Sequence, residues 1–154
     1  RFIGRCGEEV RAMFRREEVR SVIEETGYLS HAESVAELLG AHALLLVVDD
    51  TPGSEHIVPG KVYEYLGARR PILAVGPEGD VAKLIRSTGA GRDLARSDVE
   101  GISEFVLELY REWLGWGTTT FRGNSQLVER QSRRERTRDL ARVMTEVLEE
   151  RHGA

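Results

Sequence analysis

The chain has 154 residues, of which 40% are hydrophobic and 31% are charged, and its formal net charge is −4. A chain of this length suits one domain and buries roughly 70% of its unfolded surface, enough for a hydrophobic core. The longest apolar run, Ala43–Val48, is too short for a membrane-spanning helix, and a single cysteine, Cys6, excludes an internal disulfide framework. We expect a reduced cytoplasmic protein, either free or at the membrane periphery. Its acidic balance argues against a nucleic-acid partner.

The predicted elements alternate between short extended segments and helices. In chain order they are a strand at 2–4, a helix at 8–19, an extended stretch ending at 27–29, a helix at 30–39, a strand at 43–48, a loop at 49–60, a helix at 60–68, a strand at 71–75, and helices at 80–87, 97–113 and 132–148. The run at 43–48 lacks alternation, which predicts a strand covered on both faces. This order specifies an α/β fold, a Rossmann-like parallel sheet with helices on both faces.

The helix starts and the composition divide the chain into three parts. Capping boxes are predicted at three helix starts, and their outer residues are Ser30 with Glu33, Ser97 with Glu100, and Ser132 with Glu135. We expect residues 1–114 to form the α/β domain and residues 115–131 to form a linker. Residues 132–154 are expected to form a helix whose apolar face consists of Leu140, Val143, Met144, Val147 and Leu148. That helix packs back on the domain or toward another domain.

The loop at 49–60 lies where an open α/β sheet binds its ligands, beyond the carboxyl end of a strand. Gly53, Ser54 and Gly60 allow a ligand to approach the backbone closely, and Lys61 adds a cation at the start of the next helix. Free N–H groups and a partial positive charge at a helix start suit a phosphate. The loop is not a P-loop, because its glycines and lysine lack that spacing. An anion site and a plain structural turn both remain open.

Glu64 follows Lys61 by one helical turn. A carboxylate that accepts hydrogen bonds from two vicinal hydroxyl groups is a common way to hold a ribose. A solvent-exposed helix glutamate is the alternative. The four histidines of the chain lack metal-ligand spacing, so no protein-bound metal is expected.

The segment 59–73, Pro-Gly-Lys-Val-Tyr-Glu-Tyr-Leu-Gly-Ala-Arg-Arg-Pro-Ile-Leu, resembles the donor-site signature of GT-B glycosyltransferases, especially the family-four type. The flanking segments 27–31, 43–48, 88–91 and 132–148 resemble the corresponding parts of that fold. The resemblance implies the C-terminal half of a GT-B fold. It implies a nucleoside-diphosphate sugar, with UDP or GDP as the nucleotide, as a donor substrate rather than a bound cofactor.

By that resemblance, Glu64 binds the ribose hydroxyls of the donor. The residues expected near the diphosphate are Gly53, Ser54, Gly60 and Lys61, and the backbone of Tyr28 and Leu29 is expected beside the base. The most common family motif has a second glutamate eight positions before Glu64. Here that position holds His56, with Glu55 beside it, and these two are the candidate catalytic residues.

GT-B enzymes also have an N-terminal acceptor domain, and their donor domain begins with a strand–helix unit before the segment that resembles Phe2–Gly4. Neither is found in this sequence, so the resemblance implies a donor-binding part that has no transferase activity alone. The missing strand leaves an unpaired sheet edge and uncovered apolar surface. Expected partners are therefore an N-terminal acceptor domain, a glycan, lipid or small-molecule acceptor, and a second copy of the chain.

Three alternatives remain. A nucleotide-sugar epimerase half shares the same donor-site layout. A receiver-like signalling domain is suggested by Asp49 and Asp50 after a strand, although Lys61 and Glu64 are then unexplained. The chain could also serve as a non-catalytic interaction module.

Overall fold

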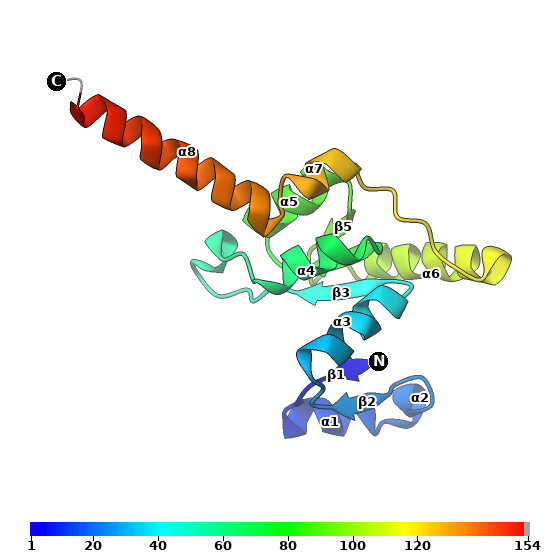
Figure 1. The fold of residues 1–154 in the computed structure, drawn as a ribbon. Helices are drawn as coiled ribbons and strands as arrows, with labels where there is room; N and C mark the ends of the chain where they lie inside the picture. Colours follow the sequence, from blue (N-terminus) through cyan, green and yellow to red (C-terminus); the bar gives the residue numbers. More distant parts are fainter. Residues whose placement is uncertain (153–154) are drawn as a thin grey trace. The chain divides into compact units, whose positions relative to one another are not determined.

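The structure is a computed structural model that describes residues 1–152, and the chain divides into two units, Arg1–Glu37 and Leu38–Ala154. The elements in chain order (Figure 1) are β1 Phe2–Ile3, α1 Glu8–Phe14, α2 Glu17–Arg20, β2 Glu25–Gly27, α3 His31–Gly40, β3 Leu44–Val47, the 3₁₀ turn η1 Ser54–His56, α4 Lys61–Ala68, β4 Ile72–Val75, α5 Asp80–Thr88, β5 Gly91–Leu94, α6 Val99–Trp116, α7 Ser125–Glu129 and α8 Arg133–His152. The predicted α/β class is confirmed, as two short parallel sheets flanked by helices. None of the described helices is long and apolar enough to cross a membrane.

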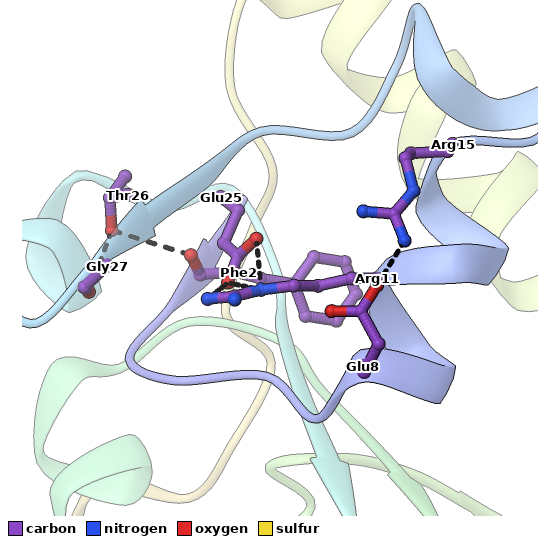
Figure 2. Close-up of polar contacts among 7 residues, drawn as sticks. All are labelled: Phe2, Glu8, Arg11, Arg15, Glu25, Thr26 and Gly27. Carbon is purple, nitrogen blue, oxygen red and sulfur yellow. Dashed lines mark hydrogen bonds and ion pairs between the residues drawn. The ribbon is translucent and has the colours of Figure 1, made fainter.

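The first unit is held together mainly by contacts between side chains that are exposed or partly exposed. β1 pairs with β2 in parallel, and every described side chain of this unit is at least partly exposed. Figure 2 shows Arg11 of α1 reaching Glu25 of β2, with Nη2 donating to Oε1 at 2.9 Å, while Arg15 pairs with Glu8. This contact holds the pKa of Glu25 below its usual range. These polar contacts and the packing of Phe2 on Phe14, whose ring centroids are 4.4 Å apart, therefore take the place of a buried core in this unit.

The expected helix at 8–19 is interrupted, because Arg16 is extended, with φ −62° and ψ 140°. Arg15 and Arg16 precede Glu17 and Glu18. Cations favour a helix end and anions favour a helix start, so these charges suit two short helices better than one long helix.

The second unit is built on the parallel sheet β3-β4-β5, with β4 in the centre. On one face, α4, α5 and α7 cover the strands, and Val62, Ile72 and Ile85 are fully buried there. On the other face, Phe105 and Leu109 of α6 pack against Leu73 of β4. The expected helices on both faces of a parallel sheet are thus present in this unit.

β3 is an edge strand, and the expectation that both of its faces are covered is wrong. Leu44 and Leu46 are buried, but Leu45 and Val47 are 47% and 59% exposed. The register places Leu45 beside Leu73, on the face where α6 packs over β4 and β5 and leaves β3 open.

Two elements were not expected, and one helix start differs. β5 has the sequence Gly-Arg-Asp-Leu, which lacks the apolar character of a buried strand, and α7 lies inside the expected linker. The start of α6 is capped by Asp98, whose side chain accepts from the Gly101 amide, and not by Ser97. At α8, Ser132 accepts from the Glu135 amide as expected.

The capping box at the start of α3 is confirmed and makes stability pH-dependent. Glu33 Oε2 accepts from the Ser30 amide at 2.8 Å and from the Ser30 hydroxyl at 2.6 Å. These hydrogen bonds, chiefly the one from the hydroxyl, lower the pKa of Glu33. A lowered folded-state pKa stabilises the fold above the unfolded-state value, about 4.3, and this stability is lost as the pH falls through the folded-state value.

We expect Glu33→Gln to remove this pH-dependent contribution, because glutamine still caps the helix but does not titrate. The melting temperature of the wild type should exceed that of the variant at pH 7, and the difference should shrink on acidification below about pH 4.3. Thermal melts followed by circular dichroism between pH 7 and pH 3 measure it. A difference that stays constant across this range would contradict the assignment.

Candidate functional site

Three loops meet at the carboxyl end of the sheet in the second unit. They follow β3, β4 and β5, and their closest contacts involve Val48, Glu55, Gly76, Gly79 and Arg96. A Cβ atom on Gly76 would lie 2.7 Å from Val48 Cβ, and one on Gly79 would lie 2.3 Å from the Glu55 carbonyl oxygen. Arg96 Nη2 donates to the Val48 carbonyl at 2.8 Å. Only glycines allow the first two loops to approach this closely.

The loop after β3 is folded by its own polar groups. Gly53 has φ +91°, a left-handed conformation that favours glycine. The Ser54 hydroxyl is buried and donates to the Asp49 carbonyl at 2.8 Å. Glu55 Oε2 accepts from the Gly53 amide at 2.9 Å. Ser54 and Glu55 therefore fix the shape of the loop with their side chains.

The loop leads directly into α4, whose first turn carries Lys61 and Glu64. Both side chains are exposed, and neither forms an ion pair or a hydrogen bond within the described residues. The Val62 amide already donates to Pro59 and the Tyr63 amide to Gly60, at 3.1 and 3.2 Å. The amides of Gly60 and Lys61 are therefore the ones that this helix start can offer to a ligand.

Gly60 is not required by the fold of the chain alone. It has φ −54° and ψ −31°, which any residue adopts, and a Cβ atom there would meet nothing within 4 Å. The space in front of Gly60 is therefore open to a ligand that approaches the start of α4.

His56 is exposed and lies between two carboxylates. Its Nδ1 is 3.6 Å from Asp80 Oδ2, and its Nε2 is 3.9 Å from Glu55 Oε1. Asp80 also accepts from Lys83 Nζ at 3.3 Å. His56 therefore lies on the loop before α4 with a carboxylate oxygen beside each of its ring nitrogens.

Arg96 lies on the third of these loops, the one that follows β5. The sequence did not indicate Arg96 as a site residue, because β5 was not recognised as a strand. The guanidinium of Arg96 also lies 3.9 Å from Asp49 Oδ1. A basic residue two positions after a short polar strand is a weak signal. Recognising β5 would have placed Arg96 at the ligand-binding end of the sheet.

Arg86 of α5 anchors the loop after β4. Its Nη1 donates to Glu78 Oε2 at 2.9 Å and to Asp93 Oδ2 at 2.7 Å. The contact with Arg86 lowers the pKa of Glu78. A small hollow of about 10 Å³ beside this loop is lined by Val48, Ala74, Gly76, Pro77, Val81, Ala82, Asp93 and Leu94. Ligand pockets usually have about 300–1,000 Å³, so this hollow is too small for a whole nucleotide.

The remaining predicted site residues lie in the first unit. Tyr28, which is 84% exposed, and Leu29 follow β2. The other predicted site residues, Gly53, Ser54, Glu55, His56, Gly60, Lys61 and Glu64, lie in the second unit, on the loop after β3 and on the start of α4. Among the described residues, no group of three or more His, Cys, Asp or Glu side chains is placed to hold a metal ion.

Comparison of the chain with protein-family models, with curated proteins and with solved structures finds no match.

Proposed function

We propose that the loop at 53–60 and the first turn of α4 bind the diphosphate and ribose of a nucleoside-diphosphate sugar. In this proposal the chain is the donor-binding part of a glycosyltransferase. The observation that carries it is the pair Lys61 and Glu64, which are exposed on one turn and free of ion pairs and hydrogen bonds in the described part of the chain. They lie at the ligand-binding end of a parallel sheet.

The diphosphate is assigned to the start of α4. Lys61 and the free amides of Gly60 and Lys61 attract an anion, and the helix dipole adds to that attraction. The open space in front of Gly60 supports close approach of a phosphate oxygen. The same groups stabilise negative charge on the departing diphosphate when the sugar is transferred.

The ribose is assigned to Glu64, whose carboxylate accepts from the two hydroxyls. His56 and Glu55 lie on the loop before α4 and are assigned to the sugar side of the donor. Sugar transfer then needs an acceptor domain that completes the reaction site, so we expect the 154-residue chain alone to bind nucleotide without transferring sugar.

Replacing Glu64 with alanine is expected to weaken nucleoside-diphosphate binding by about 2–3 kcal/mol, the range for hydrogen bonds to a charged group. This corresponds to about a 30- to 150-fold loss of affinity. Calorimetric titration of the chain with UDP, GDP and ADP measures it, and the 2′-deoxy forms should lose less because they lack one hydroxyl. Glu100→Ala is the matched control, because Glu100 is an exposed first-turn residue of α6.

The same titrations test the anion site. The wild type should bind the diphosphate more tightly than the nucleoside, and Lys61→Met should reduce that preference. Lys83→Met should leave it unchanged, because Asp80 already pairs with that lysine. Equal affinity of the wild type for nucleoside and diphosphate, or an equal loss for ribo- and deoxyribonucleotides in Glu64→Ala, would overturn the proposal.

A further inference from the structure

Arg96 links the two outer strands of the sheet in the second unit. It follows β5 by two positions, Val48 follows β3 directly, and β4 lies between these two strands. In the described part of the chain, the backbone ladder pairs β3 with β4 alone. Arg96 Nη2 donates to the Val48 carbonyl oxygen at 2.8 Å, so this side chain reaches across the carboxyl end of the central strand. The loops after β3 and β5 are thereby held together at the candidate site.

The first half of the loop after β3 is organised around Asp49. The Asp49 carboxylate accepts from the Asp50 amide at 2.8 Å and from the Thr51 hydroxyl at 3.1 Å. The Asp49 carbonyl accepts from the buried Ser54 hydroxyl at 2.8 Å. The Arg96 guanidinium lies 3.9 Å from Oδ1 of the same carboxylate. Arg96 therefore acts, from outside the loop, on the residue at which these loop hydrogen bonds converge.

We propose that Arg96 is a positioning residue for the diphosphate, which holds the loop after β3 and, through it, the start of α4. This inference rests on the function proposed above. A guanidinium that donates to a carbonyl makes a charge-assisted hydrogen bond, which is stronger than a neutral one. The loop is therefore ordered before a ligand arrives, and an ordered loop binds more tightly because less conformational entropy is lost on binding.

Hydrogen exchange measured by NMR without nucleotide tests the anchoring of the loop. In Arg96→Met, the amides of Asp50 and Ser54 should exchange at least about tenfold faster, the effect of losing a hydrogen bond from a charged donor. The amide of the buried Ile72 should keep its rate. Arg96→Lys should restore most of the protection, because a lysine also offers a charged donor. Arg111→Met, at an exposed arginine of α6, is the matched control and should change neither rate.

Calorimetric titration tests the consequence for binding. Arg96→Met should weaken nucleoside-diphosphate binding by about tenfold or more and leave nucleoside binding largely unchanged, because the loop is assigned to the diphosphate. Asp49→Ala should act in the same direction, since it removes the carboxylate that organises the loop. The double variant should lose less binding free energy than the sum of the two single losses, because both substitutions act on one loop.

The outcomes separate the role of Arg96 from the proposed function. A wild type that binds nucleoside and diphosphate equally overturns the proposed function, and with it any role of Arg96 in binding. A wild type that prefers the diphosphate, with an Arg96→Met variant that keeps this preference, overturns the role of Arg96 alone. Unchanged exchange of the loop amides in Arg96→Met does the same, whether or not nucleotide binds. So do additive losses in the double variant, which a direct contact between Arg96 and a phosphate would produce.

Discussion

Replacing Gly91 with alanine is expected to lower the free energy of unfolding of the second unit by about 3 kcal/mol or more. A Cβ atom on Gly91 would lie 1.8 Å from the carbonyl oxygen of Ile72 and 2.6 Å from its carbonyl carbon. Ile72 is fully buried in the central strand and cannot move aside. The strands β4 and β5 must therefore separate, and the ladder between them is lost.

Chemical denaturation followed by circular dichroism measures the effect of Gly91→Ala. Gly115→Ala in α6 is the matched control, because a Cβ atom there meets nothing within 4 Å, and alanine in a helix stabilises by up to about 1 kcal/mol relative to glycine. A Gly91→Ala variant whose stability stays within about 1 kcal/mol of the wild type would show that β4 and β5 do not pair as described.

Gly79→Ala is expected to disrupt the fold and the candidate site together. The new Cβ atom would lie 2.3 Å from the Glu55 carbonyl oxygen and 2.8 Å from Glu55 Cα. The loop that holds Gly53 and leads to Lys61 must move away from the loop after β4. We expect a loss of about 1–3 kcal/mol in stability, the usual cost of overpacking, and weaker nucleoside-diphosphate binding in the protein that remains folded.

Denaturation and calorimetry on the same Gly79→Ala sample separate the two effects. The expected loss of affinity is at least about tenfold, which corresponds to 1.4 kcal/mol. Gly115→Ala again serves as the control for both measurements. If Gly79→Ala loses stability but binds the diphosphate as the wild type does, the contact between the loops is structural and the loops do not form one site.

The sequence predicted the elements that have a strong local signal. The apolar run that ends at Val75 predicted β4, and Ser30 with Glu33 predicted the start of α3. β5 was not predicted, because its sequence lacks the apolar pattern of a buried strand. Arg92 and Asp93 occupy positions where such a strand usually has apolar residues, and contacts with neighbouring elements hold β5 in place. Arg86 from α5 pairs with Asp93, and such a tertiary contact leaves no periodic signal in the sequence.

The loops at the candidate site could also be predicted from the sequence only in part. The polar residues, prolines and glycines at 49–60 predicted a loop with turns at its glycines. The left-handed conformation of Gly53 confirms one of these turns. The pattern did not indicate that Glu55 would close the loop on Gly53, or that Arg96 would reach Val48 from a third loop. These contacts depend on the loop conformation and on the order of the strands in the sheet. Neither can be predicted from the pattern of residue types along the chain.

The place of β3 as the outer strand of its sheet also affects how the protein behaves at high concentration. Natural sheets discourage stray strand addition with lysine, proline or bulges along their outer strands. The four residues of β3 are Leu-Leu-Leu-Val, and they carry none of these safeguards. The net charge of −4 resides elsewhere on the chain. Colloidal stability therefore depends on long-range repulsion, which salt screens within about 10 Å at 0.1 M ionic strength. We therefore expect added salt to favour edge-to-edge aggregation.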